Sequence, residues 1–182
     1  NGLGDIGITR RDLLNVFWEP GITDIQRSRY VFDTELVDKD LLAQSYPDIA
    51  DKIKSNTFVA TKFLYDDSVP TDGKVTVIEC YYHKHVGGKK TLQYIKYVSD
   101  QVLYASENDT EPQKSMQPVP SGTSEEGTPV TEKSEVITGP SVAERGWYDH
   151  GMYPFVFDCL FPIEGSPCGY GFVDLCRTAQ EQ

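Results

Sequence analysis

The sequence lacks any long hydrophobic run. No stretch approaches the ~18 apolar residues that a membrane-spanning helix requires, so we expect no membrane association. Basic residues are also scarce, since 17 Lys and Arg stand against 28 Asp and Glu and give a net charge of −11. Such a chain repels polyphosphate, and its basic residues occur only in short groups. Tight binding of nucleic acid by this chain alone is therefore not expected.

The sequence begins with Asn1 and so lacks an initiator methionine, and no charged-then-apolar leader follows it. We interpret it as part of a longer protein. Cysteines are few and stand singly, without a C-x-x-C pair. We predict that they are small buried side chains in a reducing compartment, and the even count leaves the disulfides of a secreted protein as the alternative. The four are Cys80, Cys159, Cys168 and Cys176.

What the sequence does contain is short segments in which apolar and polar residues alternate, the pattern of half-buried strands. Residues 5–10 and 29–37 each predict one strand. Residues 74–106 predict a three-stranded antiparallel meander, with tight turns at Gly87-Gly88 and Asp100-Gln101. Apolar residues occur on both faces of its first strand. One face is therefore expected to meet the core and the other a helix or a neighbour.

Short helices are expected beside these strands. Residues 12–18 are predicted to be extended and to end at a turn formed by Pro20 and Gly21. Asp38 or Asp40 can cap a helix over residues 40–46, and Pro47 stands in the first turn of a helix over residues 47–54. Both helices are too short to be stable unless they pack on a sheet. The predicted fold class is α+β and strand-rich, an antiparallel sheet packed by short helices.

The chain divides into three parts by composition. Residues 1–107 hold the strands, short helices and meander described above. Residues 108–140 contain no aromatic residue and are rich in Pro, Gly, Ser, Thr and acids, which predicts a polar, acidic, mobile loop or long excursion with at most a weak strand at residues 135–138. Residues 141–182 are expected to form the last strands, at 146–162, and then the beginning of a helix.

Two patterns suggest a ligand but lack the context that they need. Residues 2–7 spell G-x-G-x-x-G, yet no strand precedes them and no helix pattern follows, so a dinucleotide site is not favoured. Cys80, His83 and His85 could contribute to a metal site with His150 as a further ligand. On a strand, however, Cys80 points away from both histidines. We predict no metal and no cofactor.

A cysteine hydrolase is the only catalytic arrangement that the residues suggest. It would combine Asp149 and His150 with Cys159 or Cys168 as the nucleophile. There is no G-x-S-x-G motif, and the cysteines occupy positions where apolar residues belong. We therefore do not expect an enzyme, and this arrangement remains a less favoured alternative.

A cluster of glycine and proline near the carboxyl end has no G-K-[ST] and is not a phosphate loop. Its glycines permit a sharp change of direction, and its prolines stiffen the approach. We predict a structural joint between a sheet and a helix. Its residues are Pro162, Gly165, Pro167, Gly169 and Gly171.

Three stretches in chain order, residues 15–32, 74–109 and 148–176, together resemble one family. The last of them, which begins Tyr-Asp-His-Gly, is the most specific. The chain resembles the portal proteins of tailed bacteriophages, of the type found in prophages of Firmicutes. The similarity covers most of the chain except residues 108–140. The residues that carry it most clearly are Trp18, Pro20, Gly21, Asp24, Tyr148, His150, Gly151, Tyr153, Pro154 and Phe155.

The resemblance implies a structural protein rather than an enzyme. Portals form rings, typically of twelve subunits, at one vertex of the capsid, and they conduct DNA during packaging and ejection. Their partners are other portal subunits, the terminase and neck proteins, in the virion and, during assembly, in the host cytoplasm. This chain resembles the outer wing of a subunit, followed by the start of a helix that leads to the stem. Because ring contacts in the family draw on other parts of the subunit, we expect this chain alone to be mostly monomeric.

One alternative belongs to a different class of function. The chain could be a protein-binding β module that captures a partner on an edge of the meander or through residues 108–140.

Overall fold

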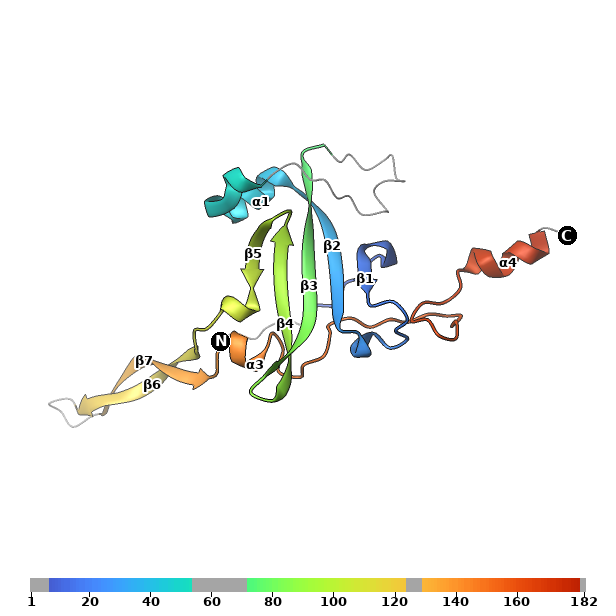
Figure 1. Cartoon of the computed structure of the whole chain (residues 1–182). Helices are drawn as coiled ribbons and strands as arrows, with labels where there is room; N and C mark the ends of the chain where they lie inside the picture. Colours follow the sequence, from blue (N-terminus) through green and yellow to red (C-terminus); the bar gives the residue numbers. More distant parts are fainter. Residues whose placement is uncertain (1–6, 54–71, 124–128, 181–182) are drawn as a thin grey trace.

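The computed structural model describes residues 7–53, 72–123 and 129–180. At its centre lies a five-stranded antiparallel sheet in the order β1-β2-β3-β4-β5, so strands that follow one another in the chain are also neighbours in the sheet (Figure 1). A few short helices accompany the sheet, which confirms the strand-rich α+β fold class. The strands are β1 (Val16–Trp18), β2 (Tyr30–Asp38), β3 (Lys74–Val86), β4 (Lys89–Val98) and β5 (Gln101–Ala105).

The meander formed by β3, β4 and β5 is the part of the fold that the sequence predicted best. Gly87 and Gly88 have φ values of 58° and 83°, as a two-residue hairpin turn with the twist of its flanking strands requires. The second turn lies one residue earlier than predicted, because Val98 pairs with Gln101 and leaves Ser99 and Asp100 as the loop. Ser99 takes a positive φ of 50° to close it.

Short helices cover one end of the sheet. Helix α1 (Lys39–Ser45) and the 3-10 helix η3 (Pro47–Lys52) stand near the two predicted positions, although η3 is not α-helical. Leu42 of α1 and Ile53 pack against buried valines of β3 and β4. The prediction for residues 12–18 is only partly right. The 3-10 turn η1 (Leu13–Asn15), which the Asp12 carboxylate caps by accepting from Leu14 N, precedes β1.

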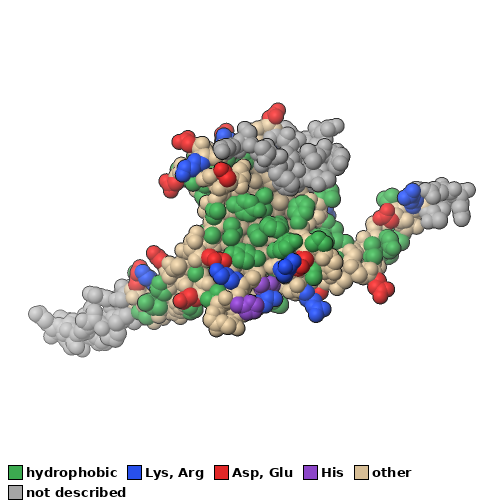
Figure 2. Space-filling view, in the orientation of Figure 1, with side chains coloured by type: hydrophobic (Ala, Val, Ile, Leu, Met, Phe, Trp, Pro, Cys, Tyr) green, Lys and Arg blue, Asp and Glu red, His purple; other side chains and the backbone are tan. Residues whose placement is uncertain are grey.

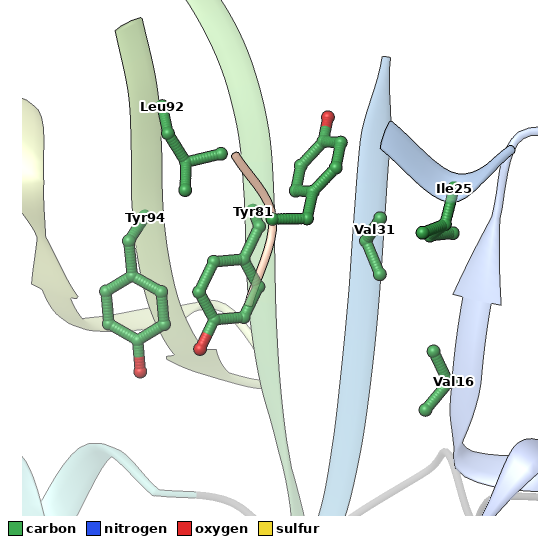
Figure 3. Close-up of a cluster of buried hydrophobic side chains, with 7 residues drawn as sticks. Val16, Ile25, Val31, Tyr81, Leu92 and Tyr94 are labelled. Atoms are coloured by element: carbon green, nitrogen blue, oxygen red, sulfur yellow. The ribbon is translucent and has the colours of Figure 1, made fainter. Parts of the chain in front are cut away.

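The inner face of the sheet, on which the core lies, carries a cluster of mostly aromatic and branched side chains (Figure 3). Trp147 stacks on Tyr94 with ring centroids 4.6 Å apart, and Phe155 meets Tyr81 edge-on at 5.3 Å. Ile25 comes from the 3-10 turn η2 (Ile25–Arg27). The buried members are Val16, Ile25, Val31, Tyr81, Leu92, Tyr94 and Tyr153.

The opposite, outer face is also largely apolar. The strand register places its side chains opposite one another, for example Phe17 against Phe32 and Phe32 against Cys80. Most of them are half-buried rather than buried. Figure 2 shows hydrophobic side chains gathered over the middle of the sheet, with charged groups below them. The outer-face residues are Phe17, Tyr30, Phe32, Ile78, Cys80, Tyr82, Ile95, Tyr97 and Val102.

Two predicted strands are wrong. Of residues 5–10, those from residue 7 on are described, and they have no regular structure; the Ile8 side chain is 98% exposed, so nothing buries one face of a strand there. Residues 146–162 alternate between packed and exposed side chains, but they form no strand ladder. Part of their backbone is hydrogen-bonded instead to the side chain of Gln26.

Residues 108–140 form an excursion, but not an irregular loop. Strands β6 (Gln113–Thr123) and β7 (Pro129–Gly139) pair as a separate two-stranded antiparallel sheet, here called the hairpin arm. It projects from the body (Figure 1). Backbone hydrogen bonds build such a ladder without aromatic side chains, which is why composition alone missed it. The predicted weak strand at residues 135–138 is part of β7.

The chain leaves the body for the hairpin arm after the 3-10 turn η4 (Ser106–Asn108) and returns to it at helix α3 (Val142–Arg145). The last helix is α4 (Phe172–Gln180), which begins close to the predicted start. Residues 158–180, here called the C-terminal arm, leave the body beside β1 (Figure 1). In the described ranges, no helix has the length and apolar character that a membrane span needs. All four cysteines are free and half-buried.

Candidate functional site

The two most characteristic segments of the sequence meet in space. Residues 18–28, around η2, contact residues 147–157 on the inner face, and we call this contact the junction. Its centre is the Gln26 side chain, 127 residues away in sequence from Tyr153. Tyr153 N donates to Gln26 Oε1 at 2.9 Å, and Gln26 Nε2 donates to Tyr153 O at 3.1 Å and to Phe155 O at 3.3 Å. One amide side chain thus replaces the backbone of a neighbouring strand.

We call residues 147–157 the late segment. Tyr153 is the most buried side chain that it supplies to the junction. It is 3% exposed, its hydroxyl donates to Ser28 O at 2.9 Å, and its ring lies 4.5 Å from that of His83. Burial raises the pKa of the Tyr153 hydroxyl, so this group stays protonated and continues to donate. Trp18 packs edge-on against Phe157 at 5.0 Å. The junction is therefore a packed, neutral contact.

Three other motif residues shape the turn that presents Gln26. Gly21 has a φ of 80° and sits with Pro20 in the predicted turn after β1. The Asp24 carboxylate accepts from Gln26 N at 3.0 Å and caps η2. Asp24 thereby fixes the backbone from which the Gln26 side chain extends.

The remaining motif residues lie where the late segment enters the inner face. The Tyr148 and His150 rings stack at 5.3 Å, and His150 Nδ1 accepts from Met152 N at 3.0 Å. Gly151, with a φ of 65°, presents its carbonyl oxygen to His83 Nε2 at 3.0 Å. Pro154 is exposed. These contacts guide the chain across the sheet end.

The possible metal ligands are not brought together. Cys80 lies on the outer face, and burial raises the pKa of its thiol to about 11. His83 lies on the inner face beside Tyr153, and desolvation lowers its pKa. His85 is exposed. The described residues hold no group of three or more His, Cys, Asp and Glu side chains that could bind a metal ion.

The acid and the histidine of the cysteine-hydrolase alternative each have another partner. The Asp149 carboxylate pairs with Arg145 Nη1 at 2.7 Å rather than orienting His150. His150 Nδ1 is occupied by the Met152 amide. Burial raises the pKa of the Cys168 thiol, with the Cys159 side chain acting in the same direction, which disfavours a thiolate nucleophile.

The glycine and proline cluster forms a tight turn at the base of the C-terminal arm. Pro162 and Gly169 pair as an isolated antiparallel bridge, and Tyr170 N donates to Phe161 O at 2.8 Å. Gly165 has a φ of 82°, and a side chain at Gly169 would overlap the Phe161 carbonyl. Pro167 is half-buried beside the arm's turn. That this turn acts as a joint toward a longer helical region remains a prediction.

The first turn of α4 does not favour a phosphate. Gly171 N donates to the Asp174 carboxylate at 3.1 Å, so a negative charge of the protein already occupies this helix end. A shallow pocket of about 390 Å³ lies nearby, between η2 and the late segment. It is lined by Thr23, Asp24, Ile25, Gln26, Phe155, Val156, Phe157 and Pro167.

Two features of the site escaped the sequence reasoning. The role of Gln26 gave no local signal, because its partner lies at a sequence separation of 127. A charged group inside the sheet was also missed. Asp33, 3% exposed, pairs with Arg11 Nε at 3.0 Å, and Lys96 pairs with Glu79 at 3.1 Å on the same face. Desolvation raises the pKa of Asp33 despite Arg11, and its Oδ1 has no hydrogen-bond partner.

Compared with known proteins, the chain matches no family model, and it matches no curated protein sequence. The functional argument therefore rests on the chain's own residues.

Proposed function

We propose that this chain is the wing part of a subunit of a tailed-phage portal, the ring at the capsid vertex through which DNA is packaged and ejected. In this proposal the protein performs no catalysis and carries no cofactor. It acts in the virion and, before that, in the cytoplasm of the infected or lysogenic bacterium. Its partners are neighbouring portal subunits, the terminase and neck proteins, and DNA passes through the assembled ring.

One observation carries the proposal. The stretches with the most specific resemblance, residues 15–32 and 148–176, contact each other through the Gln26–Tyr153 hydrogen bonds and the Trp18–Phe157 rings. Motif residues that lie far apart in sequence therefore serve one structural purpose, which is to fix where the late segment leaves the sheet. A wing has to aim the helical part of its subunit in this way.

The charge of the chain supports the same proposal. A conduit needs duplex DNA to slide past without adhering, and a net charge of −11 opposes adhesion. The free, half-buried cysteines fit a protein that assembles in a reducing cytoplasm.

The direct test is to express the complete reading frame that contains this chain and to image it by electron microscopy. Rings with a central channel and about twelve-fold symmetry are expected. Particles without rotational symmetry, from protein that is folded by circular dichroism, would refute the proposal. The neighbouring genes give a second readout, with a terminase gene expected upstream and a capsid protease or scaffold gene downstream.

A protein-binding β module is the second candidate, and the hairpin arm is the observation that favours it. Isolated two-stranded hairpins are marginal in water, and Met116 and Ile137 are 64% and 66% exposed on this one. Deleting residues 113–139 and closing the gap with a short Gly-Ser linker tests this candidate. If the arm is a capture device, deletion abolishes binding of a phage or host protein, whereas ring formation by the full subunit is retained.

A further inference from the structure

Two apolar surfaces of the described residues are left partly exposed. The first is the outer face of the sheet, where Phe17 and Val102 at its two edges are 39% and 57% exposed. The second is the C-terminal arm, in which Leu160 is 89% exposed and Val173 is 77% exposed. Soluble proteins rarely leave contiguous apolar patches uncovered unless the patches bind something.

The arm points away from the body. It leaves beside β1, and α4 lies well clear of the sheet (Figure 1). Its exposed apolar residues therefore face solvent instead of the sheet of the same copy. They are Leu160, Tyr170, Phe172, Val173 and Leu175.

The charges around the two surfaces are complementary. The arm carries Asp158, Glu164 and Asp174 against a single base, Arg177. The outer face is bordered by bases at the end nearest the β3–β4 turn, and Figure 2 shows Lys and Arg side chains below the apolar centre. Arg29 and Lys84 lie there, but their charges are balanced by Glu19 and Glu107, so the excess positive charge comes from Lys89, which is exposed at the turn. A slightly basic border beside an apolar surface suits an apolar, acidic segment.

We infer that the outer face of one copy binds the C-terminal arm of a second copy of this chain. The side chains of Leu160 and Phe172 pack on the apolar centre, and the arm's carboxylates lie toward the basic border. The contact is heterologous, because a face meets an arm and not another face. Repetition of a heterologous contact gives a closed ring or an open chain.

This inference rests on the proposed ring and adds a contact to it, because it places a subunit interface within residues 1–182. It also replaces the expectation that the chain alone is mostly monomeric. Self-association of this chain is therefore the property to measure.

The experiment uses the 182-residue chain, with its mass measured by sedimentation velocity as the concentration is raised. The parent chain is expected to form dimers and larger species. Leu160→Asp, in the arm, and Phe17→Glu, in the face, would each place an unpaired charge in the contact. Each is expected to raise the dissociation constant by about a hundredfold or more. Val102→Asp tests the other edge of the face, in case Phe17→Glu disturbs the short strand β1.

Two matched controls carry the same kind of charge elsewhere. Leu41→Asp, on α1, and Met116→Asp, on the hairpin arm, replace residues that are 55% and 64% exposed. Both are expected to associate like the parent chain. Circular dichroism verifies that every variant retains the sheet.

Mixing distinguishes a heterologous contact from any other. Leu160→Asp keeps an intact face, and Phe17→Glu keeps an intact arm, so the two variants together are expected to form a one-to-one dimer and nothing larger. A parent chain that stays monomeric, variants that associate like the parent, or a mixture that stays monomeric would overturn the inference. None of these outcomes bears on whether the complete reading frame forms a portal ring, which the imaging experiment decides separately.

Discussion

The sheet and the two arms of this molecule differ in how far they bury their apolar side chains. In the sheet, apolar side chains of the inner face are buried by partners that arrive from distant parts of the chain, such as Tyr153 and Trp147. In the hairpin arm and the C-terminal arm, side chains such as Met116, Leu160 and Phe172 stay in solvent. The sheet buries one of its two faces within the same chain, whereas the two arms leave their large apolar side chains exposed. The inner face therefore contributes most to stability, and the arms contribute little.

The largest difference between these regions in the free energy of unfolding is expected when two glycines that each face a backbone carbonyl are replaced by alanine. Gly146 has a φ of 93°, and a Cβ there would lie 2.8 Å from Leu92 O on β4. Gly146→Ala is expected to lower the free energy of unfolding by about 3 kcal/mol, because positive-φ strain adds to this overlap. Gly169→Ala also overlaps a carbonyl, that of Phe161, but it lies in the arm. It should change the value by less than about 0.5 kcal/mol.

Urea unfolding followed by tryptophan fluorescence measures both variants, since Trp18 and Trp147 lie in the inner-face core. Equal losses from the two substitutions would show that the C-terminal arm belongs to the same cooperative unit as the sheet.

The next largest effect is expected at the boundary between the regions. Gln26→Leu removes three hydrogen bonds to the late segment and is expected to cost about 2 kcal/mol. Proteolysis between residues 153 and 161 should accelerate while the meander stays protected. Gln26→Glu still accepts from Tyr153 N but donates to neither carbonyl, so its cleavage rate should fall between those of Gln26→Leu and the parent. Unchanged cleavage of Gln26→Leu would mean that the aromatic contacts alone hold the segment.

A smaller, pH-dependent effect is expected at His83. Desolvation lowers its pKa in the folded protein, with the charges of Lys90 and His85 adding to this and the hydrogen bond to Gly151 O opposing it. The folded state then binds fewer protons than the unfolded one. The contribution is fully present above the ordinary pKa of 6.5 and is lost as the pH falls from there through the folded-state value.

Stability measured by urea unfolding from neutral pH to below 6.5 checks this dependence. His83→Asn should flatten the slope in that window, and His85→Asn, at an exposed position, should retain it. A slope that persists in His83→Asn would assign the dependence to another group.

The smallest effects are expected from ion pairs, and they again differ between the regions. Lys96 pairs with Glu79 at 3.1 Å within the sheet, and Lys114 pairs with Glu135 at 3.6 Å across the hairpin arm. Lys96→Ala is expected to cost about 1 kcal/mol, because Glu79 is left largely enclosed. Lys114→Ala should change stability by less than about 0.3 kcal/mol, since both partners are well exposed. A larger loss from Lys114→Ala in thermal unfolding would contradict the separation of the arm from the core.

The sequence was informative where structure depends on neighbours in the chain. Alternation along residues 74–106 and the pair Gly87-Gly88 predicted the meander, since both signals act within a few residues. The same reasoning failed at residues 146–162. Packing of Tyr153, Phe155 and Phe157 on one side gives a period of two whether or not a strand pairs with them. Nothing nearby shows that the pairing partner is a glutamine side chain.

The hairpin arm and the candidate site show the same limit. Composition correctly indicated that residues 108–140 bury little, but it does not report the backbone ladder that pairs β6 with β7. The motif residues were identified individually, and Asp24, Tyr153 and Phe155 do gather around Gln26. These residues meet only because the chain returns across the inner face of the sheet, and a short stretch of sequence cannot predict that return.

The junction also bears on how the protein acquires its fold during synthesis. The meander can pair as soon as residue 105 has emerged from the ribosome, because its contacts are local. The aromatic surface that Tyr153 and Phe157 cover stays open until some fifty further residues have been made, about three to ten seconds at ~5–20 residues per second. During that interval a nascent chain presents both sides of its sheet to solvent. Cells that make many copies at once therefore have a reason to translate this protein where chaperones are plentiful.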